Sequence, residues 1–219
     1  MTDEKSTLES VEESDSSSEV KLVKKESLSK LVVFALQKQM EVLKLKQFAV
    51  MIGFVFAATF IRALMKSMPN SLPSVEPITF FAVLAGWLFG SISGFSVGSS
   101  SLFLSNFMVF GGQGPWTPFQ MLGFGAAGFL GGLLRKKASI FEAIAVTLMA
   151  TVFYEIFINF TSILFGGYSI FAAFVFSIPF SLIHIGTNCA FSLMLPAAKK
   201  VVDRSGGFSD AKQFTELVS

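Results

Sequence analysis

The stretch ITFFAVLAGWLFGSISGFSVGSSSLFLSNFMVF, residues 78–110, decides the fold of this chain. As one straight helix it would be about 50 Å long, well beyond the ~30 Å hydrocarbon core of a bilayer. Its middle, residues 90–94 (GSISG), has two glycines that would allow a tight turn between two shorter helices. The stretch therefore contains either one membrane span or two, and the number sets the topology of the whole chain.

The composition is that of an integral membrane protein. Hydrophobic residues make up 52% of the chain, the mean hydropathy is +0.64, and 27 of the 219 residues are phenylalanine. A soluble domain would not be so apolar, and stretches near the ~20 residues needed to span a bilayer recur along the chain. Besides 78–110, these stretches are residues 47–66, 118–134, 139–165 and 170–196.

The distribution of positive charge chooses between one and two spans in residues 78–110. With two spans, the N-terminal lysines, the 135–137 cluster (RKK) and the cations at 199–204 all lie on one side of the membrane. With one span, the 135–137 cluster lies opposite the N-terminal lysines, against the positive-inside rule. We therefore predict an all-α membrane protein, a six-transmembrane-helix bundle with both termini cytoplasmic, which is a multi-pass protein of the cell (plasma) membrane.

Charge and hydropathy divide the chain into four segments. Residues 1–27 are acidic and serine-rich and then basic, and we predict a disordered tail. Residues 28–46 place apolar side chains at helical spacing between lysines, which fits an amphipathic helix on the anionic cytoplasmic leaflet; a solvated helix or a flexible arm fits equally well. Residues 47–200 are the predicted six-helix membrane domain, and residues 201–219 a cytoplasmic tail.

The loop that begins GGQGPWTPFQM, residues 111–121, lies outside the membrane in the predicted topology. Its two prolines fix the backbone, and Trp116 favours the headgroup level. Gln113, Thr117 and Gln120 offer hydrogen-bond donors and acceptors. A plain connector needs none of these features, so we predict that these four side chains contact a ligand, with a packed plug as the alternative.

Polar side chains within the apolar stretches are costly in a bilayer and point to function. Glu155 and Asn159 are four residues apart, hence on one face of the fifth predicted helix, and His184 and Asn188 repeat this spacing on the sixth. A polar stripe on two helices beneath aromatic outer loops suits a small polar-aromatic ligand. The alternative is that these groups only join helices by hydrogen bonds.

The first predicted helix has a line of small residues, Ala49, Gly53 and Ala57, that would let another helix approach closely. Arg62 and Lys66, at its outer end, can reach the interface or an anionic ligand group. The chain lacks a P-loop motif and visible inverted repeats, so transport would need energy from a partner. A net charge of +2, one cysteine and one histidine lead us to expect no nucleic acid, metal or other cofactor.

Residues 94–98 (GFSVG) match the G-x-S-x-G pattern of serine hydrolases, and His184 follows on a later helix. An intramembrane hydrolase that uses Ser96 and His184 is thus an alternative reading. The nucleophile elbow, however, sits on a turn from a strand to a helix, and no strand is expected here. We interpret the small residues from Gly94 onward as helix packing and expect no catalytic residues and no enzyme activity.

The glycine pattern at 89–98, Ser105-Asn106-Phe107, the loop at 112–121 and the tail at 183–191 (IHIGTNCAF) carry a family resemblance. Together they resemble the substrate-binding S components of energy-coupling factor (ECF) transporters, over about residues 48–200 and most strongly at 78–137. Phe119 stands where a tryptophan is expected in this pattern, and the charged N-terminal tail is additional.

The resemblance implies a six-helix bundle that captures a vitamin or similar micronutrient from outside. Such a protein then associates with a transmembrane coupling subunit and two ATPase subunits, and small residues on its first helix face the coupling subunit. The outer loops and later helices form the pocket, and the Gly-Pro-Trp-Thr-Pro loop is similar to a branch associated with cobamides or their precursors. A membrane scaffold or assembly protein is the main alternative, which predicts no ligand.

Overall fold

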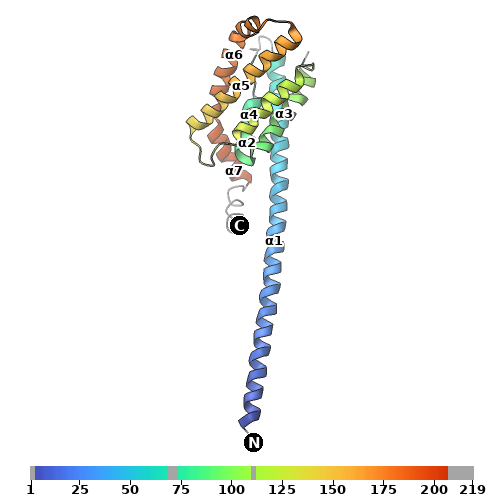
Figure 1. Ribbon diagram of the computed structural model, residues 1–219, viewed down its shortest axis with the longest axis vertical. Helices are drawn as coiled ribbons and strands as arrows, with labels where there is room; N and C mark the ends of the chain where they lie inside the picture. Colours follow the sequence, from blue (N-terminus) through green and yellow to red (C-terminus); the bar gives the residue numbers. More distant parts are fainter. Residues whose placement is uncertain (1–2, 69–73, 110–111, 207–219) are drawn as a thin grey trace. The chain divides into compact units, whose positions relative to one another are not determined.

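A computed structural model of the chain describes residues 3–68, 74–109 and 112–206, with side chains described from residue 30. These parts form seven helices and no strand (Figure 1). The chain divides into two compact units, Met1–Leu45 and Lys46–Ser219. The helices are α1 (Asp3–Ser67), α2 (Ile78–Phe89), α3 (Ser91–Met108), α4 (Thr117–Gly131), α5 (Ile140–Gly166), α6 (Ile170–Ser192) and α7 (Leu195–Gly206).

Three helical segments in the described part are long and apolar enough to cross a membrane. They are Lys30–Ser67 within α1, Ile140–Gly166 (α5) and Ile170–Ser192 (α6), and α2 is a shorter apolar helix. Their exposed surface is apolar as well: Phe60, Phe171 and Leu182 are each more than 60% exposed. Long apolar helices with this surface, as found in the described residues, are typical of a membrane protein.

The turn predicted within residues 90–94 is present at Gly90. This residue has φ +96° and ψ 167°, a conformation that only glycine adopts without strain. The turn ends α2 and starts α3, and the two helices then pack against each other and against α4. The long apolar stretch is therefore two short helices, as the sequence predicts.

Glycines bring the backbones of α2, α3 and α4 into contact. A Cβ atom added to Gly94 would lie 2.2 Å from the carbonyl oxygen of Gly128, and one added to Gly128 would lie 2.1 Å from that of Gly94. A Ser99 hydroxyl donates to the Met121 carbonyl oxygen at 2.9 Å and joins α3 to α4. These contacts show that the small residues from Gly94 onward serve helix packing, as the sequence predicts.

Helix α1 is continuous through the N-terminal region. It begins at Asp3 and continues to Ser67, and the division into a tail over 1–27 and an amphipathic segment over 28–46 stays a prediction. The chain has no glycine before Gly53 and no proline before Pro69, so no residue in this region forces a helix to end. Within the second unit, α1 packs through buried Ala58 against Ile78 and Leu102.

Helix α7 crosses the boundary predicted at residue 200 between the membrane domain and a cytoplasmic tail. Leu195 is fully buried, and Ala198 and Val202 pack on the same hydrophobic cluster, which contains Val83 and Trp87 of α2. These apolar positions follow one face of a helix, which explains why the chain continues as a helix to Gly206.

Candidate functional site

Two neighbouring groups of buried polar side chains form the candidate site. The first, the ionic cluster, consists of Arg62 and Lys66 on α1, Glu76 in the segment before α2, and Ser105 and Asn106 on α3. Arg62 Nε donates to Glu76 Oε2 at 2.6 Å, and Arg62 Nη1 donates to Ser105 Oγ and Asn106 Oδ1 at 2.9 Å each. Lys66 Nζ lies 3.1 Å from Glu76 Oε1.

In the ionic cluster, the Glu76 carboxylate is paired with two cations, Arg62 and Lys66, at a site with little contact with solvent. Burial is the largest influence on the pKa of Glu76 and acts to raise it, but Arg62 and Lys66 outweigh burial. The pKa of Glu76 therefore lies below its ordinary value of 4.5, and the carboxylate stays charged at neutral pH. The cluster fixes the end of α1 to α3 and to the segment that leads into α2.

The loop before α4 leads into Gln120, which lies in the first turn of that helix and contacts the ionic cluster. Asn106 Nδ2 donates to Gln120 Oε1 at 3.1 Å. The loop also closes on itself, because the Gly114 N–H donates to Thr117 Oγ1 at 3.0 Å and Trp116 Nε1 donates to the Gly112 carbonyl oxygen at 3.2 Å. Gln113 Nε2 reaches the Phe103 carbonyl oxygen on α3 at 3.1 Å.

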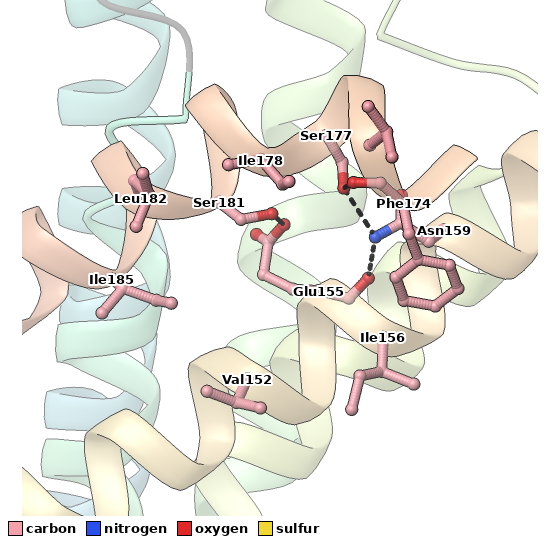
Figure 2. A pocket seen from close by; sticks show the side chains of 11 residues that line it. Val152, Glu155, Ile156, Asn159, Phe174, Ser177, Ile178, Ser181, Leu182 and Ile185 are labelled. Carbon is pink, nitrogen blue, oxygen red and sulfur yellow. Dashed lines mark hydrogen bonds between the residues drawn. The ribbon is translucent and has the colours of Figure 1, made fainter. Parts of the chain in front are cut away.

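The second group, the acid–imidazole pair and its neighbours, joins α5 to α6. Glu155 Oε1 lies 2.6 Å from His184 Nδ1, and the Ser181 hydroxyl donates to Glu155 Oε2. One turn further along α5, Asn159 Nδ2 donates to Ser177 Oγ on α6 at 3.0 Å (Figure 2). The spacing of four residues on each helix places these partners on facing sides, as the sequence predicts.

Asn188 connects three helices below His184. Its Nδ2 atom donates to Thr151 Oγ1 on α5 at 2.9 Å and lies 3.4 Å from Thr79 Oγ1 on α2. His184 and Asn188 are each only 1% exposed. Within the described residues, His184 Nε2 and Asn188 Oδ1 are buried atoms with no hydrogen-bond partner, so this face of α6 still has hydrogen-bonding capacity.

Tyr154 links the two groups. Its ring lies edge-on to the His184 ring, with centroids 5.2 Å apart, and its other neighbour is Phe124 of α4 at 4.6 Å. Tyr154 also packs on the hydrophobic cluster of Ala58, Ile78, Leu102 and Phe124. Ala58 and Leu102 lie about one helix turn from Arg62 and Asn106, so this packing connects the acid–imidazole pair to the ionic cluster.

A groove of about 320 Å³ runs between α5 and α6 over this region (Figure 2). Its wall is mainly aliphatic, and Glu155, Ser181, Asn159 and Ser177 supply the polar atoms. A second hollow of about 220 Å³ shares Asn159 and Ser177 and adds Tyr168, which the predicted topology places in an outer loop. Glu155 and Asn159 therefore line an accessible space, whereas His184 and Asn188 are buried and do not line either one.

The eight predicted ligand-binding residues fall into two groups: those that contact another helix and those whose polar atoms bond near or within the loop. Glu155, Asn159, His184 and Asn188 all take part in contacts between helices, and Gln120 reaches the ionic cluster. The polar atoms of Gln113, Trp116 and Thr117 bond within the loop or to α3, although Trp116 remains 36% exposed. The ligand-binding role of all eight residues stays a prediction.

Five partners that complete the region were not among the predicted site residues: Glu76, Ser105, Asn106, Tyr154 and Ser177. Arg62 and Lys66 lie four residues apart on one helix face, which signals a paired anion, but nothing in the sequence names Glu76 as that anion. The hydrolase alternative gains no support, because the Ser96 hydroxyl donates to the Ile92 carbonyl oxygen within its own helix. No hydrogen bond joins Ser96 to His184 among the described residues.

The predicted partner interface on α1 is open. Ala49 and Gly53 are exposed, and Ala57 is half-buried. A Cβ atom added to Gly53 would meet no atom of the described residues within 4 Å.

Comparison with known protein families gives a match. The family model described as "ECF-type riboflavin transporter, S component" matches residues 39–199, which is more than half of the chain. No curated protein and no solved structure matches the chain.

Proposed function

The chain belongs to the family of ECF-type riboflavin transporter S components, and on this premise we propose that it captures a vitamin or related micronutrient from outside the cell. It then delivers the ligand through a transmembrane coupling subunit driven by two ATPase subunits. The membership supports a membrane-embedded substrate-binding subunit.

The observation that carries the proposal is the buried acid–imidazole pair beneath the groove. Ionisable groups inside a membrane domain are costly, and a bundle that needed only stability would use apolar contacts instead. Here Glu155 and His184 are only 13% and 2% exposed in their side chains, and Glu155 also lines the groove. A ligand in this groove meets an acceptor, a hydroxyl and an amide within two turns of α5 and α6.

The substrate class has two candidates. The matching family model is named for riboflavin, and the loop at 112–121 resembles the branch associated with cobamides or their precursors. A planar ring of either class can stack on Trp116, because Pro115 and Pro118 restrict the backbone on either side of this residue. Glu155 and Asn159 would then bind polar groups on the ligand.

The arrangement in the membrane is part of the proposal: six spans, both termini cytoplasmic, in the cell membrane. Cysteines introduced at Gln113 and Tyr168 should react with an impermeant thiol reagent added outside, and one at Lys136 should not. Reaction of Lys136→Cys from outside, with Gln113→Cys protected, would reverse the orientation and move the site to the other face. Asn70, the third predicted outer position, lies outside the described residues.

Uptake into cells tests the function itself. The chain alone should bind ligand but not concentrate it, and accumulation should appear only when coupling and ATPase subunits are co-expressed. Accumulation by the chain alone would contradict the proposal. A scaffold protein, the alternative, would bind no ligand and would tolerate changes at Trp116 and Glu155.

A further inference from the structure

Helix α7 and the turn between α4 and α5 meet at one end of the second unit, on either side of Trp87. The indole Nε1 of Trp87 donates to the Arg135 carbonyl oxygen at 2.8 Å, and Lys199 Nζ lies 5.5 Å from the centre of its ring. Leu134 and Ala138 of the turn pack on the same hydrophobic cluster as Ala198 and Val202 of α7. Two segments about sixty residues apart in sequence therefore form one surface, here called the basic end.

The outward side of the basic end alternates cations with apolar side chains. On α7, Lys200, Val201 and Arg204 are exposed, with Val201 at 62%. On the turn and the start of α5, Lys137 is exposed, and Leu133 and Phe141 are 63% and 79% exposed. The inward side of α7, by contrast, is the packed face of Leu195, Ala198 and Val202. The helix is thus amphipathic with a mixed basic and apolar outer edge.

Both carboxylates described at the basic end are already paired. Glu142 accepts from Arg135, and Asp203 accepts from Lys199 at 2.6 Å. Lys137, Lys200 and Arg204 form no ion pair within the described residues. This end therefore presents surplus positive charge to whatever lies outside it.

We propose that the basic end binds the headgroups of anionic phospholipids, with Lys200 and Arg204 on the phosphates and Val201 and Phe141 at the acyl boundary. A lipid surface supplies both complements, whereas a soluble anion would leave the exposed apolar side chains in water. The aromatic and cationic residues around Trp87 are also the types that favour the headgroup level of a bilayer. Helix α7 would lie along the membrane surface rather than extend from it as a tail.

The test uses Trp87 as a local reporter. The chain has two tryptophans, so the full-length Trp116→Phe variant leaves Trp87 alone. It is reconstituted into two sets of vesicles that contain both phosphatidylcholine and phosphatidylglycerol. In one set the phosphatidylglycerol is brominated, and in the other an equal fraction of the phosphatidylcholine is brominated. Quenching of Trp87 fluorescence then measures which lipid lies beside Trp87. Lys200→Gln/Arg204→Gln removes the two unpaired cations of α7, and Lys200→Arg/Arg204→Lys is the charge-preserving control.

Brominated phosphatidylglycerol should quench Trp87 more than brominated phosphatidylcholine in the parent and in the control. The preference should fall by roughly fivefold for each cation removed, and 1 M salt should suppress it in the parent without any mutation. Equal quenching by the two lipids in the parent would overturn the proposal, as would an unchanged preference in the neutralised variant. A neutralised variant that keeps its lipid preference but no longer co-purifies with a coupling subunit would make the basic end a protein interface instead.

Discussion

Replacing Arg62 by methionine should destabilise the protein more than any other single change in the ionic cluster. Methionine keeps much of the length and the apolar stem but removes the charge, the bond to Glu76 and the bonds to Ser105 and Asn106. The side chains of Arg62 and Glu76 are only 7% and 10% exposed, and removing one partner of a buried pair costs about 3–5 kcal/mol. Lys66 still neutralises part of the Glu76 charge, which favours the lower end, about 3 kcal/mol.

The expected change is large enough for thermal unfolding of detergent-solubilised protein. For a domain of this size, about 3 kcal/mol corresponds to a fall of roughly 6–12 °C in the unfolding midpoint, compared at one scan rate. Arg62→Met/Glu76→Gln should recover part of the loss, because no buried carboxylate is left with a single partner. Lys66→Met is the matched control and should cost less, since Lys66 is 18% exposed and 3.1 Å from Glu76.

Acid should affect the same cluster. Because the pKa of Glu76 is below its ordinary value of 4.5 in the folded protein, its ion pairs stabilise the fold at all pH values above 4.5. This contribution is lost as pH falls below 4.5 and through the folded-state pKa, and Arg62→Met/Glu76→Gln should show a flatter profile there. Two results would refute a buried ionic cluster. One is an unfolding midpoint of Arg62→Met equal to that of the wild type, and the other is the same acid sensitivity in Arg62→Met/Glu76→Gln as in the wild type.

Three further predictions concern packing, assembly and ligand binding. Gly128→Ala should lower the unfolding midpoint by an amount corresponding to about 1–3 kcal/mol, because its Cβ would lie 2.1 Å from a backbone oxygen. Gly186→Ala is the control and should not lower it, since a Cβ there meets no atom of the described residues within 4 Å. Gly53→Leu adds bulk to the line of small residues on α1, so it should reduce co-purification with a coupling subunit and leave ligand affinity nearly unchanged. Loss of both would mean that the line of small residues packs inside the bundle. In calorimetric titrations, Trp116→Ala should weaken ligand binding by about 1–3 kcal/mol, roughly 5–150-fold, and Glu155→Gln should also weaken it. Wild-type affinity in both variants would move the pocket elsewhere.

Patterns within a single helix were predictable from the sequence, and contacts between helices were not. Glycines at 90 and 94 predicted the turn between α2 and α3, since a 33-residue apolar helix is too long for a bilayer. Four-residue spacing placed Glu155 with Asn159 and His184 with Asn188 on single faces. That Glu155 meets His184, or that Arg62 meets Glu76, depends on how helices are rotated against each other, and hydropathy alone does not specify rotation.

Helix α7 was missed for a related reason. Its sequence is short and polar, so composition favoured a tail, and only the cluster around Trp87 gives its apolar face something to pack on. The loop before α4 shows the opposite case: its residue types predicted a ligand contact, yet several of its polar atoms bond to the loop itself. Residue type signals capacity for hydrogen bonding, and the partner is decided by tertiary structure.

The most direct test of the central claim is calorimetric titration of the purified chain, without other subunits, against a vitamin panel that includes riboflavin and cobalamin. A substrate-capture subunit should bind one member of the panel on its own, with one ligand per chain and no requirement for ATP. Folded protein that binds no member of the panel, while a co-expressed coupling subunit also fails to co-purify with it, would contradict the account.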